Sequence, residues 1–426
     1  MLPIARTTTP AAPRSGELPG LAARFAAVRD RSCELCAPLS AEDHVVQPMP
    51  DASPAKWHLA HTTWFFEAFV LAGEPFDPSY KFLFNSYYEA VGPRVERARR
   101  GMLTRPSLDR IHAYRAAIDG RIAHALAHGS LDGDARGRLE LGLHHEQQHQ
   151  ELILTDLKYL LGTQPLSPAY RELARQASTA PEPLAWRGID GGIVELGAPE
   201  AGFAFDNERP RHRALVAPYR LATRPIANAE VLAFISEGGY RDPRLWLSDG
   251  WQRVQAEQWE APLYWRRRDG GFAIYELAGV REVDPGETAC HLSLYEADAI
   301  ARWLGARLPT EVEWEHAAAG QPLAGNFAST GRLHPERASR SPGDAPLAQL
   351  YGDVWEWTAS SYAPYPGFRP LAGALGEYNG KFMSGQYVLR GGSCLTPGGH
   401  IRRTYRNFFP PDARWQMTGV RLAADG

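Results

Sequence analysis

The pattern of apolar residues changes once along the chain, and this change constrains the fold more than any other feature. From about Leu18 to Leu161, apolar residues recur at the spacing of amphipathic helices. From about Trp186, short apolar runs instead alternate with Gly, Pro, Asp and Asn, and the stretch between is rich in Pro, Ala and Ser. We therefore expect a disordered tail (1–17), a helical bundle (18–162), a linker (163–185) and an irregular α+β domain (186–426).

The first region contains four segments that we expect to form long helices. They begin at Leu21, at Ser53–Pro54, at Ser107 and at Gly133, and the last ends at Leu161, before Gly162. A serine can cap a helix, proline suits its first position, and glycine favours the position after its last turn. Four such helices indicate a helical bundle. The stretch from Phe76 to Pro106 is long and irregular, and long loops in compact domains are often functional.

Two pairs of histidines lie on the second and fourth expected helices. His145 and His149 are four positions apart and share one helical face, while His58 and His61 lie on an otherwise apolar face. Neutral imidazoles suit iron, zinc, copper and nickel, and three ligands from two helices would leave positions open for substrate or dioxygen. We therefore predict that His61, His145 and His149 bind a metal, and that His58 and His144 have supporting roles.

The same histidines admit two other interpretations. The run His145-Glu146-Gln147-Gln148-His149 matches the H-E-x-x-H pattern of zinc proteases. A histidine on an apolar helix face is also often a hydrogen-bonded core residue. Glu146 lies about 100° around the helix from His145, so we do not expect Glu146 to be a metal ligand.

Charge and composition exclude several classes of partner. The net charge is −3, so no basic excess would attract nucleic acid. No apolar run approaches the roughly 20 residues needed to cross a bilayer, and the first residues lack the apolar core of a signal peptide. We therefore expect a cytoplasmic protein without a membrane partner. Four cysteines do not make a disulfide scaffold, and we interpret Cys33 and Cys36 as helical residues.

Several runs of residues resemble those of the ergothioneine-biosynthesis sulfoxide synthases. In the first region they are residues 56–67, 83–92 and 145–151. In the second region, residues 307–315, 352–357 (Gly-Asp-Val-Trp-Glu-Trp) and 389–393 resemble the formylglycine-generating-enzyme fold. The resemblance extends from about residue 20 to 424. It implies a DinB-like four-helix bundle joined to a C-type-lectin-like domain of the formylglycine-generating, sulfatase-modifying type.

The resemblance also implies an activity. It implies that His61, His145 and His149 hold iron(II), and that dioxygen joins a thiol sulfur to C2 of the imidazole of hercynine, the Nα-trimethylated form of histidine. The sulfur leaves as a sulfoxide. The expected partners are therefore hercynine, a thiol and dioxygen.

Three residues near the expected iron site are candidates for roles in the reaction. Gln148, beside a ligand on the helix, can hydrogen-bond an imidazole nitrogen of the substrate. Tyr87 and Tyr88 lie in the long loop, and a phenol beside iron and dioxygen can donate a proton or an electron. The resemblance favours a catalytic role for at least one of these two tyrosines; the alternative is a core aromatic pair.

Four other residues are candidates for substrate binding. Planar guanidinium groups bind carboxylates bidentately, and the resemblance places Arg97 and Arg100 at the thiol. The alternative is a solvated basic run. The segment around Asn407 and Phe408 matches one that lines the family's substrate pocket. Asn407 could hold the hercynine carboxylate, and Phe408 could face the trimethylammonium group through a cation–π contact.

The identity of the thiol follows from a departure from the family pattern. The mycobacterial branch has Asn-Trp-Asp where this chain has Asn407, Phe408 and Phe409, and its Asp recognises γ-glutamylcysteine. The change favours a smaller thiol, namely cysteine. Selenoneine synthases, which join selenium from a selenosugar to hercynine, are close relatives and remain an alternative.

Three further classes of function compete with this interpretation. A formylglycine-generating or copper-dependent thiol oxidase needs a close cysteine pair, whereas Cys290 and Cys394 stand over a hundred positions apart. A zinc-dependent thiol transferase would explain the histidines but not the second domain. A non-catalytic binding module would not explain why histidines, arginines and tyrosines gather.

Overall fold

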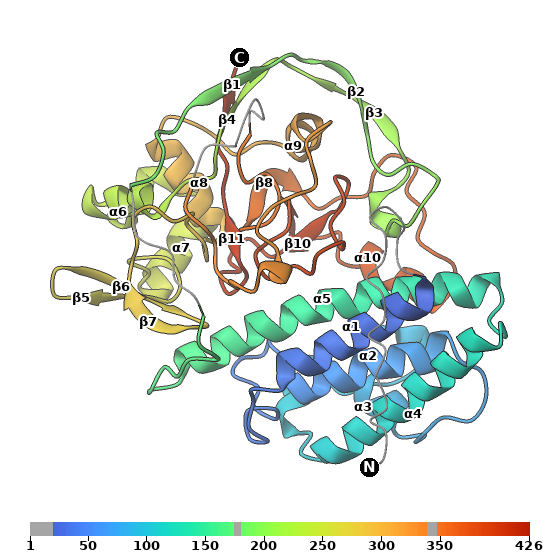
Figure 1. The fold of residues 1–426 in the computed structure, drawn as a ribbon. Coiled ribbons are helices and arrows are strands. Elements are labelled where there is room, and N and C mark those ends of the chain that lie inside the picture. Colours follow the sequence, from blue (N-terminus) through green and yellow to red (C-terminus); the bar gives the residue numbers. More distant parts are fainter. Residues whose placement is uncertain (1–19, 174–179, 339–346) are drawn as a thin grey trace, which may run out of the picture.

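The computed structural model describes residues 20–173, 180–338 and 347–426. The expected tail at residues 1–17 and part of the expected linker, residues 174–179, lie outside this range. The described chain forms a helical bundle and a larger region of short strands, helices and loops (Figure 1). No helix within these residues is long and apolar enough to span a membrane.

Four long helices and one short helix form the bundle within residues 20–173; the apolar pattern predicts the four long helices, whereas the short helix lies in the stretch expected to be irregular. They are α1 (Leu21–Cys36), α2 (Ala55–Phe69), α3 (Tyr80–Phe84), α4 (Leu108–Ala127) and α5 (Gly133–Thr163). Ser107 caps α4 as predicted, because its side chain accepts the backbone N–H of Arg110. The predicted cap at Ser53 is wrong. Pro54 occupies the N-cap position of α2, and the Ser53 hydroxyl instead accepts a hydrogen bond from Arg100.

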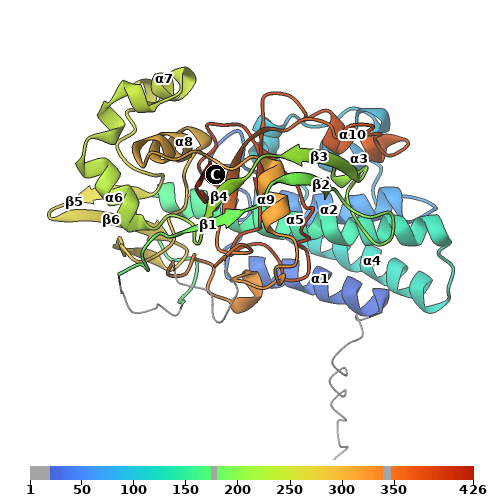
Figure 2. The same cartoon turned by 90° about the horizontal axis from the view of Figure 1, so that it is seen from above.

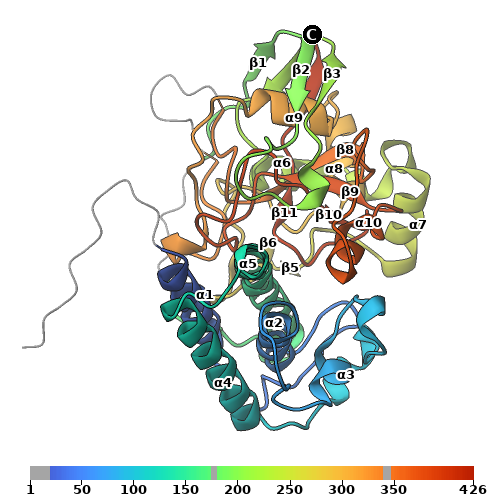
Figure 3. The same ribbon diagram turned by 90° about the vertical axis from the view of Figure 1, so that its right-hand side faces the viewer.

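Helix α5 lies between the bundle and the rest of the chain. It runs along the boundary in Figure 1 and is seen end-on between the two parts in Figure 3. Its glycines permit close packing on both sides. A Cβ at Gly142 would lie 2.4 Å from the ring of Phe66 in α2, and one at Gly162 would lie 2.6 Å from the ring of Tyr275. The predicted end of the helix at Gly162 is therefore wrong, because this glycine packs against Tyr275 of the strand at residues 271–276 and α5 continues to Thr163.

The described residues of the C-terminal region form four small sheets. Their strand orders are β1-β4-β12, β2-β3, β5-β6-β7 and β10-β9-β8-β11. The strands are β1 (Trp186–Ile189), β2 (Gly192–Leu196), β3 (His212–Val216), β4 (Tyr219–Ala222), β5 (Trp265–Arg268), β6 (Gly271–Glu276), β7 (Gly279–Glu282), β8 (Trp355–Ser361), β9 (Tyr387–Arg390), β10 (Asn407–Phe409), β11 (Thr418–Gly419) and β12 (Ala423–Asp425). Strand β11 pairs with β8 in parallel, and the other pairs are antiparallel.

Helices of this region flank the sheets. They are α6 (Asn228–Ser236), α7 (Ser248–Glu257), α8 (Leu294–Trp303), α9 (Glu311–Ala317) and α10 (Glu377–Gly380). The apolar pattern predicts α6, α8 and α9 but not α7 or the short α10.

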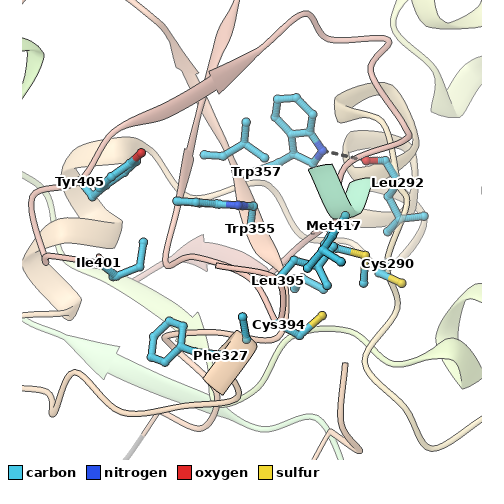
Figure 4. Packing of buried hydrophobic residues seen from close by; sticks show 14 of the residues in the cluster. Cys290, Leu292, Phe327, Trp355, Trp357, Cys394, Leu395, Ile401, Tyr405 and Met417 are labelled. Atoms are coloured by element: carbon cyan, nitrogen blue, oxygen red, sulfur yellow. Dashed lines mark hydrogen bonds between the residues drawn. The ribbon is translucent and has the colours of Figure 1, made fainter. Parts of the chain in front are cut away.

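Two tryptophans of β8 lie in the core of this region, and one of them also contacts α5. Trp355 and Trp357 are two positions apart, so they lie on one face of the strand. The Trp357 indole N–H donates to the Leu292 carbonyl at 2.8 Å (Figure 4). The Trp355 indole N–H donates to the Glu151 carboxylate of α5 at 2.8 Å. Glu151 also accepts hydrogen bonds from the hydroxyls of Ser393 (2.5 Å) and Thr396 (2.7 Å). This buried carboxylate holds the two parts together.

The long loop of the bundle also contacts the C-terminal region. It includes α3, and it approaches α10 on one side of the molecule (Figure 2). The Glu377 carboxylate accepts the backbone N–H groups of Glu89 and Ala90 at 2.8 and 2.9 Å. Lys381 donates to the carbonyl of Tyr87. The loop and α10 therefore close one side of the space between the two parts.

The close approach of α2 and α5 at Gly142 can be tested with a matched pair of glycines. Gly142→Ala should lower the free energy of unfolding by about 1–3 kcal/mol, because overpacking displaces Phe66. Gly137→Ala in the same helix should raise it by about 0.5–1 kcal/mol, because nothing lies within 4 Å of its Cβ position and alanine favours helix. Urea unfolding followed by circular dichroism measures both, and changes of the same sign would contradict this packing.

Candidate active site

Helices α2 and α5 bring together the three histidines that the spacing singled out. One ring nitrogen from each of His61, His145 and His149 lies within 4.8 Å of the other two. The Nε2 atoms of His61 and His145 are 3.2 Å apart. All three side chains are buried. The cluster follows from the i, i+4 spacing on α5 together with the close crossing of α2 at Gly142.

The three imidazoles are neutral. Burial lowers the pKa of His61 and of His149 well below the usual value, and it lowers the pKa of His145 to about 4. Neutral imidazole is the form of histidine that binds a metal. The donor set therefore fits a divalent transition metal.

A line of hydrogen bonds sets the orientation of His149. The Asp156 carboxylate lies 3.1 Å from Nε2 of His58 and also accepts the backbone N–H of Ser53 at 2.8 Å. Because a carboxylate accepts here, Nε2 of His58 carries the hydrogen and Nδ1 is left with a lone pair. Nδ1 of His58 lies 2.8 Å from Nδ1 of His149, so the His149 N–H donates to it. The Nε2 lone pair of His149 is then free for a metal.

His61 is oriented in the same way by the backbone. Its Nδ1–H donates to the carbonyl of Phe84 at 2.6 Å, so its Nε2 carries the lone pair. Trp57 stacks on the His61 ring with centroids 4.6 Å apart, and Phe65 lies 4.5 Å from the ring of His145. Nδ1 of His145 has no hydrogen-bond partner within the described chain. Packing rather than hydrogen bonding therefore holds His145.

Glu146 points away from the histidines, as expected. Its buried carboxylate pairs with Arg29 at 2.8 Å and Arg115 at 2.5 Å, and it accepts from Ser32 at 2.6 Å. Burial alone would raise its pKa, but the two arginines lower the pKa of Glu146 to about 2. A permanently ionised glutamate bound to two arginines is not the general base of an H-E-x-x-H protease.

The two cysteines of the C-terminal region are free, buried thiols. Although they are distant in sequence, Cys290 and Cys394 lie in the same core (Figure 4). Burial raises the pKa of Cys290 to about 12 and holds the pKa of Cys394 well above the usual value. Both thiols are therefore protonated in the chain without a metal. The two cysteines lie nearer in space than their sequence separation suggests, so the separation alone does not exclude a cysteine-based oxidase.

The predicted site residues surround one cavity between the bundle and the C-terminal region. Its volume is about 370 Å³. Its lining includes the three histidines together with Tyr87, Tyr88, Arg97, Arg100, Gln148, Asn407 and Phe408. It also includes residues that sequence reasoning missed, namely Asp156, Tyr378, Phe382 and Tyr405. Among these, only Asp156 had a sequence signal, since it continues the helical face of His145 and His149.

The two arginines differ in how free they are. The guanidinium of Arg100 is buried 3.4 Å above the Trp57 ring, and its terminal nitrogens donate to Ser53 (2.9 Å) and Ser86 (3.1 Å). Arg97 is partly exposed; it donates to the Tyr87 hydroxyl at 3.4 Å and to the backbone carbonyl of Asp51, and its guanidinium lies 3.9 Å from the Asp51 carboxylate. Arg97 is therefore the more exposed of the two cations, whereas Arg100 is a buried, fixed charge.

Four phenols line the cavity in different chemical states. Tyr87 accepts from Arg97, and the Tyr405 hydroxyl accepts from the Gln148 amide at 2.8 Å. Within the described residues, the hydroxyls of Tyr88 and Tyr378 have no hydrogen-bond partner. Burial raises the pKa of both far above the usual value, so both stay protonated. Tyr88 and Tyr378 are thus neutral phenols with available hydrogens.

Strand β10 supplies an aromatic wall with one amide beside it. Phe408 stacks on Tyr362 with centroids 4.1 Å apart, and Phe382 lies 5.8 Å from Phe408. The side-chain oxygen of Asn407 accepts the backbone N–H of Phe408 at 2.9 Å. Its amide nitrogen has no partner in the described part of the chain, so it can donate to a ligand.

The metal assignment predicts a loss of metal content in single variants. His61→Ala, His145→Ala and His149→Ala should each abolish iron binding and turnover, because two imidazoles leave the site short of a ligand. Elemental analysis after anaerobic iron loading measures this. His128→Ala, at an exposed position, is the control and should bind iron normally. A variant that keeps both iron and turnover would remove its residue from the ligand set.

The hydrogen-bonded line through His58 predicts an effect from a residue that does not touch the metal. Asp156→Ala should weaken iron binding by about 10–100-fold, because His58 and His149 lose their fixed tautomers. A competition titration with a chelator measures the affinity, and circular dichroism shows whether the variant is folded. Asp109→Ala removes an exposed carboxylate and is the matched control. Equal iron affinities in the two variants would contradict a role for this line of hydrogen bonds.

Comparison with known proteins identifies both parts of the chain. Residues 24–153 match the DinB superfamily, and residues 172–344 and 338–426 match the sulfatase-modifying factor enzyme 1-like domain. The expected fold, a DinB-like bundle with a formylglycine-generating-enzyme-like domain, is therefore confirmed. The helical bundle precedes the second domain along the chain, as the order of the sequence motifs predicts.

The relatives match over most of the chain. This chain is 34% identical over 398 residues to the "Hercynine oxygenase" of Mycobacterium tuberculosis, and the match covers 88% of this chain and 92% of that protein. It is 33% identical over 435 residues to the "Hercynine oxygenase" of Mycolicibacterium smegmatis, with coverages of 95% and 98%. The "Ergothioneine biosynthesis protein 1" of Schizosaccharomyces pombe is 28% identical over 232 residues, which are 52% of this chain and 27% of that one. With its fold, its histidine cluster and these relatives, the chain belongs to the hercynine oxygenase family.

Proposed function

We propose that this protein is an iron(II)- and dioxygen-dependent oxidoreductase of ergothioneine biosynthesis that joins the sulfur of cysteine to C2 of the hercynine imidazole. The observation that supports this most is the position of three neutral imidazoles in the wall of a cavity that also presents arginines, an amide and free phenols. The reaction balances with one dioxygen. The C2 hydrogen and the thiol hydrogen leave as water with one oxygen atom, and the other oxygen remains on sulfur as the sulfoxide.

His61, His145 and His149 would hold the iron. When bound, iron(II) supplies the activation of dioxygen, which does not react directly with a thiol and an aromatic C–H bond. The chain's contribution is to keep the imidazoles neutral by burial and to fix the tautomers of His61 and His149.

Hercynine fits the side of the cavity formed by β10. The free amide N–H of Asn407 can donate to its carboxylate, and the wall of Phe408 and Phe382 can face its trimethylammonium group. Such a cation–π contact contributes about 0.5–2 kcal/mol. Gln148, now bonded to Tyr405, lies where its amide can hold an imidazole nitrogen of the substrate.

Cysteine fits the side formed by the long loop. Arg97 can bind its carboxylate, with the fixed charge of Arg100 behind it. Phe409 packs near Trp415, with ring centroids 5.9 Å apart, so the position offers an aromatic ring instead of a carboxylate. This supports a small thiol without a γ-glutamyl group.

The proton for the departing oxygen can come from Tyr88 or Tyr378. Both phenols line the cavity, are protonated and have hydroxyls without a partner in the described structure. Tyr87 also lines the cavity and stays a candidate, with its hydroxyl accepting a hydrogen bond from Arg97. The structure thus adds Tyr378 to the two tyrosines that the sequence suggested.

The decisive experiment is reconstitution with iron(II) without air, followed by exposure to air with hercynine and cysteine. Mass spectrometry should find a product that combines both molecules, less two hydrogens, plus one oxygen. A product only when a selenosugar replaces cysteine would instead make the protein a selenoneine-forming enzyme. No adduct with either donor would refute the proposed reaction.

The assignment of Arg97 predicts a selective effect on one substrate. Arg97→Ala should raise the KM for cysteine by about 10-fold or more, because a charge-assisted hydrogen bond contributes about 1.5–3 kcal/mol. The KM for hercynine should change little. Arg99→Ala removes an exposed charge two positions away and should change neither. Equal increases for both substrates would show that Arg97 has a structural role.

A further inference from the structure

A second cavity, of about 480 Å³, adjoins the first. The two share six lining residues, which are Tyr88, His145, Gln148, Phe205, Tyr378 and Asn379. The shared set includes one of the three clustered histidines and both free phenols. A molecule in the second cavity is therefore separated from the histidine cluster only by the side chains of this shared wall.

The lining of the second cavity is chemically unlike that of the first. Beyond the shared wall it is mostly apolar, with contributions from Phe65, Leu141, Phe203, Ala204, Leu371, Ala372 and Leu375. Arg97, Arg100 and Asn407 line the first cavity only. The second cavity thus lacks the three side chains to which the proposed function assigns the two amino-acid substrates.

Three charged side chains line the second cavity, and two of them make hydrogen bonds within the chain. Arg138 donates from Nε to the carbonyl of Phe69. The Asp206 carboxylate accepts from the side-chain amide of Asn379 at 2.6 Å and from the backbone N–H of Leu371 at 3.3 Å. Asp134 lies in the first turn of α5, where the helix dipole favours a negative charge. Apart from these three side chains, the lining beyond the shared wall is apolar or glycine.

We propose that this second cavity is the entry route and waiting site for dioxygen, and that the charged substrates use the first cavity. The inference rests on the proposed function, in which dioxygen is a substrate. Dioxygen is small and apolar and makes no strong hydrogen bonds, so it partitions into an apolar cavity that charged molecules avoid. Once hercynine and the thiol occupy the first cavity, they block the path through it, and a gas then needs another path.

The geometry delivers the gas to the reacting groups. Leu141 lies one turn before His145 on α5, and Phe65 packs against the His145 ring. Tyr88 and Tyr378 face both cavities. Dioxygen that crosses the shared wall therefore arrives beside the histidine cluster and the phenols together, with no need to displace either amino-acid substrate.

The test fills the second cavity without touching the first. Leu375 is partly buried and lines only the second cavity, so Leu375→Trp should obstruct it. The expected result is a rise of about 10-fold in the KM for dioxygen, with the KM values for hercynine and cysteine unchanged. Ala372→Trp, at an exposed position of the lining, repeats the test without disturbing the core. Leu323→Trp, at a side chain that is 54% exposed and outside both cavities, is the control.

A second readout does not depend on turnover. Crystals of the full chain under xenon pressure should show xenon in the second cavity, since apolar cavities bind it, and Leu375→Trp should exclude it. Absence of xenon from this cavity would overturn the proposal even if the enzyme forms the sulfoxide. A KM increase for hercynine or cysteine in Leu375→Trp would overturn it in favour of a substrate entrance. If xenon binds but no adduct forms in the reconstitution experiment, the proposed reaction is refuted, whereas the affinity of the cavity for a gas is confirmed.

Discussion

The structure depends on the burial of one helix on two sides. Helix periodicity divides α5 into a face that carries His145, His149 and Asp156 toward the bundle interior and a face that carries Gln148 and Glu151 toward the sheet region. The same 31 residues therefore hold two of the three proposed metal ligands and the contacts between the two parts. A small rotation of this helix would move both sets at once, so the fit to the C-terminal region also positions the ligands.

Buried polar contacts, rather than apolar area alone, make that fit specific. Glu151 accepts three hydrogen bonds from the C-terminal region, and Lys158 on the same helix contacts Nε2 of His291 at 2.7 Å. Burial lowers the pKa of Lys158 and raises that of Glu151. Each of these buried polar groups therefore needs the hydrogen bonds from its partners. Apolar surfaces tolerate sliding, whereas unmatched buried donors and acceptors do not. These hydrogen bonds fix the position of α5 against the C-terminal region and therefore the shape of the cavity between them.

Local patterns were sufficient where the relevant contacts are local. The i, i+4 histidines, the cap at Ser107 and the expected helices of the bundle follow from spacing and side-chain chemistry. Ser53 and Gly162 were misjudged because both are used by partners distant in sequence, a guanidinium in one case and an aromatic ring in the other. Tyr378 carries no local signal, since only tertiary packing brings it to the cavity. The topology of the second domain likewise came from motif resemblance and not from periodicity.

The hydrogen-bonded line from Asp156 through His58 to His149 has a consequence for how such chains diverge. Each histidine of this line needs one particular tautomer, because a nitrogen that carries a hydrogen must face a neighbour that offers a lone pair. Two of the three, Asp156 and His58, are not among the proposed ligands, yet a change in either would alter the tautomer of His149. We therefore expect substitutions at the three positions to be coupled, so that a change at one is tolerated only with a compensating change at another.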